Sequence, residues 1–263
     1  MNLAILQFIW IISLLQMVRV ASAEDFSITP NEAVEVKQRL EAYDNGGLDV
    51  RQLIGSDVEE NCRQLIGYYI THTNNISTKE KLPISRCYAG FGNFVEAVEL
   101  AHEYVNVYSN DFKGWVILGY CHVALEDHNS AIHEYTVAVN LGDTNSYEPL
   151  AGEALRAHRI DIVQNILPQL MALQHARETS QDHMINLTTI LTGYSLIADR
   201  KDILIKALDG HNLKELLQDD TIRKNVTSGC QIFQGKDIDN IRKEMEAALG
   251  SNTNSSKTNS PSP

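Results

Sequence analysis

The fold of this protein is decided by residues 115–138, which read WVILGYCHVALEDHNSAIHEYTVA. Apolar side chains recur at helical spacing on both sides of a polar turn, which predicts two helices joined by a short connection. The small residues Gly119 and Ala131 fall on different helices and would let the two approach closely as an antiparallel pair. The larger side chains expected to fill the space between the helices are Trp115, Leu118 and Tyr135.

The same local setting occurs earlier in the chain. Residues 92–97, GNFVEA, precede one expected helix and residues 127–131, DHNSA, precede another, so that Ala97 and Ala131 lie 34 residues apart. Self-similarity at a fixed period of about 20–50 residues indicates stacked structural repeats. We therefore expect adjacent helix hairpins in this part of the chain.

These residues resemble the tetratricopeptide repeat (TPR) family, whose unit is a helix hairpin of about 34 residues. The positions that carry the resemblance are Trp115, Leu118, Gly119, Ala131, Tyr135 and Ala138, with His122 where the family favours Tyr. The resemblance implies an all-α fold, a right-handed α-α superhelix (TPR-like solenoid) of helix hairpins with flanking capping helices. It also implies that Cys87 and Cys121, at the same place in successive repeats, are buried.

Other helix pairs are expected around this unit. An earlier hairpin at about 82–110 has its leading helix shortened by Pro83, and a later one contains Leu150 and Val163, with Pro168 expected to bend its second helix. A degenerate fourth pair, or a plain helical hairpin, begins near Leu187. The expected divisions are a signal peptide at 1–23, N-terminal capping helices at 24–78, TPR-like repeats at 79–176, a degenerate repeat with C-terminal capping helices at 177–250, and a disordered polar tail at 251–263.

Two capping boxes place the N-terminal helices. Thr29 and Glu32 open a helix expected to end near Tyr43, and Ser56 and Glu59 open a second one. The loop at 44–49 carries carboxylates beside glycines, but it lacks the spacing and the terminal Glu of a calcium site.

The first segment predicts export. Residues 3–18 are almost wholly apolar and are followed by Arg19 and the small residues of 21–23, which is typical of a signal peptide cut after Ala23. The apolar run is shorter than the about 20 residues that a membrane-spanning helix needs. We therefore expect a secreted/extracellular or periplasmic protein with no stable membrane insertion after signal cleavage.

Removing Arg19 takes the formal charge from -12 to -13. An acidic chain repels phosphate backbones, so nucleic acid is not expected as a partner. Cys62, Cys87, Cys121 and Cys230 could form up to two bridges in an oxidising compartment or serve as small buried residues, and both interpretations stay open. Sequons occur at Asn75, Asn186, Asn225 and Asn254.

Motifs for chemistry are absent from the sequence. The chain has no HExxH or CxxC, no phosphate loop and no nucleophile elbow, so no catalytic residue, cofactor or metal ion is expected. Cys121-His122 is the nearest approach to a reactive pair. An enzyme would need an unrecognised site, such as His122, His133 and His158 brought together by folding.

A binding groove is what the resemblance implies instead. TPR-type helix pairs line a concave groove with their leading helices. By position the groove residues are Arg86, Ala89, Lys113, Val116, Tyr120, Val123, Asn145, Glu148, Leu155 and Arg156. The cations among them would attract a carboxylate of a peptide or protein partner, unless they are ordinary solvated side chains.

The expected function is therefore a non-enzymatic exported protein–protein interaction module, of the kind that acts as an assembly or scaffold factor. The alternative is a helical small-molecule-binding protein, with an apolar ligand enclosed near Pro168.

Overall fold

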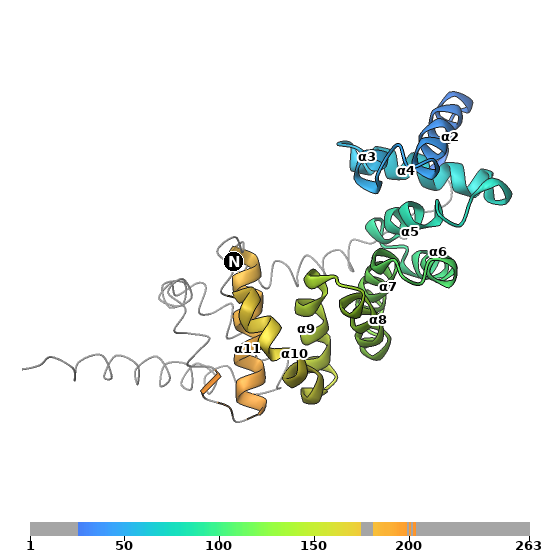
Figure 1. Cartoon of the computed structure of the whole chain (residues 1–263). Coiled ribbons are helices and arrows are strands. Elements are labelled where there is room, and N and C mark those ends of the chain that lie inside the picture. The colour runs from blue at the N-terminus through green and yellow to red at the C-terminus, as the bar shows by residue number, and fades with distance from the viewer. Residues whose placement is uncertain (1–25, 175–180, 199, 201, 204–263) are drawn as a thin grey trace, which may run out of the picture. The chain divides into compact units, whose positions relative to one another are not determined.

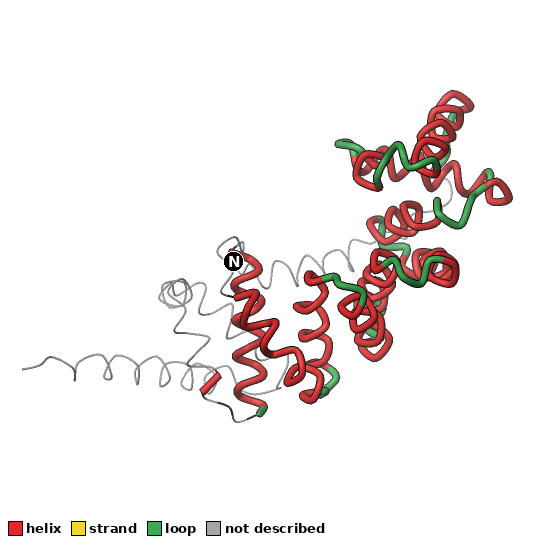
Figure 2. The backbone as a smooth tube through the Cα atoms, in the orientation of Figure 1, coloured by secondary structure: helices red, strands yellow, loops and turns green. Residues whose placement is uncertain are grey.

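The computed structural model describes residues 26–174, 181–198, 200 and 202–203. Within them every regular element is a helix (Figure 1, Figure 2), so the all-α prediction is confirmed for this part of the chain. The expected signal peptide at 1–23, the expected helices beyond 203 and the tail at 251–263 lie outside the described residues. None of the described helices is long and apolar enough to cross a membrane.

The helices follow one another with short connections. In chain order they are α2 (Pro30–Asp44), α3 (Val50–Ile54), α4 (Val58–Thr71), α5 (Lys81–Gly90), α6 (Phe94–Val107), α7 (Phe112–Ala124), α8 (His128–Asn140), α9 (Tyr147–Arg156), α10 (Ile160–Gln174) and α11 (Gln181–Ile197), with 3-10 turns η2 (Thr73–Asn75) and η3 (Thr144–Ser146).

The chain divides into two compact units, one containing α2 to α8 and the other containing α9 to α11. In the first unit, α4, α5, α6 and α7 each pack on the next helix along the chain, and the leading helices α5 and α7 also contact each other. In the second unit, α9, α10 and α11 contact one another. The hairpins α5–α6 and α7–α8 therefore lie side by side in the first unit, as the repeat predicts.

Helix ends match the capping chemistry with one shift. Thr29 accepts from the backbone of Glu32, whose side chain accepts in return, so the first expected capping box is confirmed. The second was placed one residue too early, because Asp57 rather than Ser56 caps α4, accepting from Glu60 N. A short helix that the sequence did not predict, α3, follows the loop at 44–49, and Asp49 caps it.

The hairpin turns share one backbone geometry. Gly92, Glu126 and His158 end the leading helices of the three hairpins with positive φ angles of 78°, 60° and 56°. In the first turn, Gly92 N–H donates to Ala89 O and the next N–H to Tyr88 O, and the other two turns repeat this pattern. Such paired bonds satisfy carbonyls at a helix end. The repeat is therefore visible in the backbone as well as in the side chains.

Replacing Glu126 by glycine is expected to raise the free energy of unfolding by about 1 kcal/mol, because a left-handed backbone places the Cβ of any other residue close to a carbonyl oxygen. Thermal denaturation measures the change. The control is Glu126→Ala, which removes the same carboxylate but keeps the Cβ. This variant should show no increase in the free energy of unfolding. An equal gain in both variants would attribute the effect to charge and contradict the backbone explanation.

Small residues bring α7 close to both neighbours. A Cβ on Gly119 would lie 2.8 Å from the Tyr135 ring on α8, and one on Gly114 would lie 2.6 Å from Val105 on α6. The sequence predicts that Gly119 and Ala131 make the close approach together. The atoms nearest to Gly119 all belong to Tyr135, one helical turn after the buried Ala131.

The other repeat positions divide between core and rim. Ala97, Leu118, Ala131, Tyr135 and Ala138 are buried, as a structural role requires. Trp115 is half-buried, and its indole N–H donates to the Ser109 carbonyl over 2.9 Å.

The prolines are compatible with the helices that contain them. Pro83 is the third residue of α5, where the backbone N–H has no partner within the helix in any case. Helix α10 continues through Pro168. In the second unit, Leu187, near which the degenerate fourth pair or plain helical hairpin was expected to begin, is buried on α11 together with Leu191 and Tyr194.

Candidate functional site

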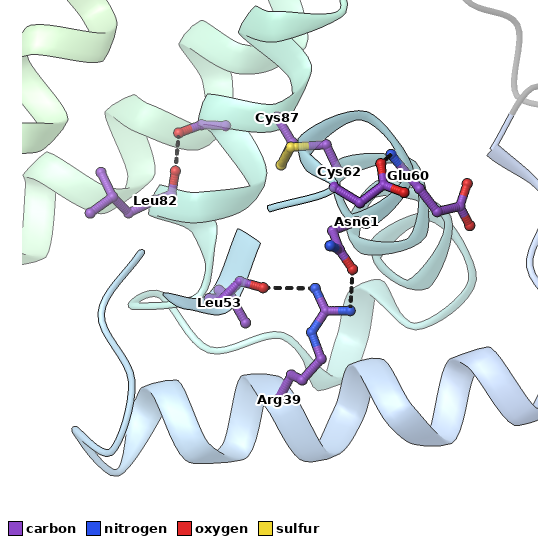
Figure 3. Close-up of a disulfide and its surroundings, with 9 residues drawn as sticks. Arg39, Leu53, Glu60, Asn61, Cys62, Leu82 and Cys87 are labelled. Carbon is purple, nitrogen blue, oxygen red and sulfur yellow. Dashed lines mark hydrogen bonds between the residues drawn. A yellow bond between two sulfur atoms is a disulfide. The ribbon is translucent and has the colours of Figure 1, made fainter. Parts of the chain in front are cut away.

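A disulfide fastens the N-terminal helices to the first hairpin. Cys62 on α4 and Cys87 on α5 are bonded with their Cα atoms 5.0 Å apart (Figure 3). Cys121 is a free thiol, buried as the resemblance implies, and Cys230 lies outside the described residues. The bridge interpretation therefore holds for Cys62 and Cys87, and the interpretation as a small buried residue holds for Cys121.

Arg39 ties the same region together from below the disulfide (Figure 3). Its guanidinium donates to Asn61 Oδ1 over 2.9 Å and to the Leu53 carbonyl over 2.8 Å. These bonds join α2 to α3 and α4. The N-terminal helices thus form a cross-linked support next to α5.

One face of α7 carries the central part of the predicted groove. Lys113, Val116, Tyr120 and Val123 follow one another at intervals that place them along one side of the helix. Lys113 and Tyr120 are exposed, the latter by 46%, and the two valines are half-buried. The opposite side is buried. The Tyr120 ring also contacts Phe94 of α6, with centroids 6.1 Å apart.

The predicted groove residues of α5 have different surroundings. Arg86 is exposed, whereas Ala89 is buried and belongs to the core. No carboxylate among residues 26–174 and the described part of α11 forms an ion pair with Arg86 or Lys113. The same is true of Arg51 on α3. These cations are therefore available to a partner's carboxylate.

The groove residues near α9 are already engaged or buried. Asn145 donates to Asp143, Glu148 accepts from Asn186 Nδ2 over 2.9 Å, and Arg156 pairs with Glu153. Leu155 is fully buried. Since α9 belongs to the second unit, a single groove that holds Arg86, Lys113, Asn145 and Arg156 together stays a prediction.

A cleft of about 890 Å³ lies at the N-terminal helices, and Pro168, near which an enclosed ligand was expected, is not among the residues that line it. It is lined by α2, by the end of α4 and by the segment that follows. Glu80 also lines the cleft, and burial raises the pKa of this carboxyl group. The cleft mixes apolar side chains such as Leu40 with charged ones such as Lys37.

The Cys121-His122 pair is not arranged for nucleophilic chemistry. Burial, with Glu134 as a second cause, raises the pKa of the Cys121 thiol to about 12. A thiol in this state carries no thiolate at neutral pH, and the thiolate is the nucleophile. His122 instead turns to α8, where its Nδ1 lies 2.7 Å from Oε2 of Glu134.

His102 of α6 completes this group. Its ring centroid lies 6.2 Å from that of His122, and ligand atoms of His102, His122 and Glu134 all lie within 4.8 Å of one another. Burial lowers the pKa of His102, with His122 as a second cause, and burial raises the pKa of Glu134. We refer to these three residues as the His-His-Glu cluster.

The sequence predicts neither this cluster nor its members' proximity. It suggests His122, His133 and His158 as a possible catalytic group, but His133 is exposed with its ring against Trp115, and His158 is an exposed residue of the second unit. The residues that meet His122 come from helices α6 and α8, which no local motif connects. The one available signal is His122 itself, because the resembled family favours Tyr there.

Comparison with models of known protein families finds no match for this chain, and comparison with curated proteins finds none either.

Proposed function

We propose that this protein is a non-enzymatic, exported interaction module that binds a peptide or protein segment along the leading helices of TPR-like hairpins, acting as an assembly or scaffold factor. On this proposal the hairpins continue as a right-handed solenoid, and the partner lies across α5 and α7.

The accessible face of α7 carries the proposal. Lys113 and His122 are the only basic residues of this helix, and it contains no acidic one. A helix that is apolar on every side is normally enclosed. Here Tyr120 remains 46% exposed beside half-buried valines. An apolar face that the protein's own described helices leave uncovered is typical of a binding surface.

The charges around this face specify the partner's chemistry. Arg86 and Lys113 have no carboxylate partner among the described side chains, on a chain whose formal charge is -12. An apolar segment with a carboxylate, at its C-terminus or on an acidic side chain, satisfies both features. Tyrosine is among the residues that contribute most to binding at such surfaces.

The disulfide supports the export part of the proposal. Bonds of this kind form and persist in oxidising compartments and are rare in the cytosol. The bridged residues are Cys62 and Cys87. The expected signal peptide at 1–23 agrees with export to an oxidising compartment.

Selection from displayed random peptides on the immobilised full chain tests the binding function. We expect enriched peptides that combine apolar side chains with a carboxylate. Tyr120→Ser and Lys113→Glu should each weaken binding of a selected peptide about tenfold, the size expected for losing one central contact. Fluorescence anisotropy with the labelled peptide measures the affinities.

Arg51→Glu is the matched control, because Arg51 is an exposed cation on α3 that also has no carboxylate partner among the described residues. This variant should bind as the parent does. If Arg51→Glu and Lys113→Glu weakened peptide binding equally, the effect would be explained by the change in net charge and not by contact with α7. Selection of no peptide, or of peptides insensitive to both α7 variants, would contradict the proposed surface.

A further inference from the structure

Three consecutive helices of the first unit each contribute one metal-binding side chain to the same place. His102 comes from α6, His122 from α7 and Glu134 from α8, and their ligand atoms lie within 4.8 Å of one another. His102 is exposed, His122 is 14% exposed in its side chain, and Glu134 is 4% exposed. The cluster is therefore anchored in the core and open to solvent at one end.

The carboxylate is the unusual member, because a buried Glu is rarely left with a single partner. Among the described residues, the only donor to Glu134 is His122. A second acid, Asp127, acts on both residues through its charge. The cluster thus combines two imidazoles with a buried carboxylate that has one donor in the described part of the chain, and a metal cation there would be favoured by all three side chains.

The donor types narrow the choice of cation. Imidazole nitrogens suit zinc and its neighbours among the transition metals, whereas magnesium and calcium take oxygen ligands. Two His and one Glu, with a fourth position left to water, is a known zinc arrangement. From this geometry we propose that His102, His122 and Glu134 bind a divalent transition-metal ion of the zinc type.

Small movements of side chains bring the donors into position. Zinc bound at about 2.0–2.2 Å to each ligand places tetrahedral donor atoms about 3.4 Å apart. His102 is exposed and can turn inward to bring its ring nitrogen closer to the other two ligand atoms, since all three already lie within 4.8 Å of one another. His122 and Glu134, 2.7 Å apart, need only separate slightly as the ion replaces the proton between them.

The ion would join the two hairpins, since α6 belongs to the first and α7 and α8 to the second. A ligand that binds only the folded state stabilises it. The metal would therefore hold α6 against α7 and α8, because each of these three helices supplies one ligand. This role is independent of the proposed peptide binding, and neither depends on the other.

Zinc titration of the chelator-treated full chain tests the proposal. Competition with a chromophoric chelator should show one Zn²⁺ bound per chain, and the melting temperature should rise when zinc is added. Co²⁺ in place of zinc should give the visible absorption of a tetrahedral ion. His102→Ala removes an exposed ligand without disturbing the core and should weaken zinc binding about 100-fold or more. Even the loss of a group that only hydrogen-bonds to a metal ligand lowers metal affinity about 10–100-fold.

His133→Ala is the matched control, because His133 is an exposed histidine of α8 next to Glu134 and is outside the cluster. This variant should bind zinc as the parent does. Glu134→Gln provides a second test, with circular dichroism to verify folding. The proposal would be overturned if the parent and His102→Ala bound zinc equally. It would also be overturned if the parent bound neither Zn²⁺ nor Co²⁺ in this titration.

Discussion

Replacing Cys62 and Cys87 together by alanine is expected to lower the free energy of unfolding by about 3.5 kcal/mol, the chain-entropy value for a bridge that closes a loop of this length. The bonded residues are 25 positions apart. The bond limits the unfolded chain, and it also joins α4 to α5 at the point where the N-terminal helices meet the first hairpin. The melting temperature should fall by about 10 °C.

Calorimetry of the parent and the double variant measures this loss, and Cys121→Ala is the control. Cys121 is also a fully buried cysteine, but it has no bridge. Its replacement removes the same sulfur atom from the core and should cost about 1 kcal/mol. The difference between the two variants isolates the cross-link.

Reduction gives a second measurement without mutation. Dithiothreitol should lower the melting temperature of the parent and leave that of the double variant unchanged. If the double variant lost no more stability than expected from two Cys121→Ala replacements, or if the reductant had no effect on the parent, the bridge would contribute nothing.

Helix pairs in this chain are predictable because their determinants are local. Asn93 and Asp127 are the N-cap residues of the second helices of successive hairpins, 34 residues apart, and each follows a residue with a left-handed backbone. At the first turn this residue is Gly92, which the sequence displays, whereas at the second it is Glu126, which only the backbone reveals. Local chemistry also explains the one-residue shift at α4, since Ser56 and Asp57 can both cap a helix.

Features that join distant segments are not predictable in this way. The Cys62–Cys87 pair was one of several possible pairings, and α3 escaped notice because its helix is only five residues long. The His-His-Glu cluster depends on how α6, α7 and α8 pack. For the groove, position in the repeat predicts which face of α7 is accessible, but it cannot predict that Leu155 is buried or that Arg156 pairs with Glu153.

Gly67 is a further close contact that the sequence does not predict. It lies within α4, and a Cβ there would overlap the Phe26 carbonyl and approach Ile28 Cγ2 to 2.6 Å. The segment before α2 therefore rests directly on the backbone of α4. It is held there by Phe26, which is 4% exposed and packs edge-on against Tyr88 and Phe91.

Replacing Gly67 by alanine is expected to lower the free energy of unfolding by about 2 kcal/mol. Burying a Phe side chain contributes about 1.5–3 kcal/mol, and the overlap would lift Phe26 from its position. The gain in helix propensity, about 1 kcal/mol, offsets only part of the combined strain and lost contact. Chemical denaturation measures the stability, and cleavage by chymotrypsin after Phe26 should accelerate in the native protein.

Gly90→Ala separates the overlap from the general effect of removing a helical glycine. Gly90 is the last residue of α5, and a Cβ there meets nothing within 4 Å. This control should be neutral or slightly stabilising. If Gly67→Ala matched it in stability and in resistance to chymotrypsin, the Phe26 segment would not lie against α4. A loss confined to Gly67→Ala would instead show that the Phe26 segment is fixed on α4 by backbone contact, which only glycine at this position allows.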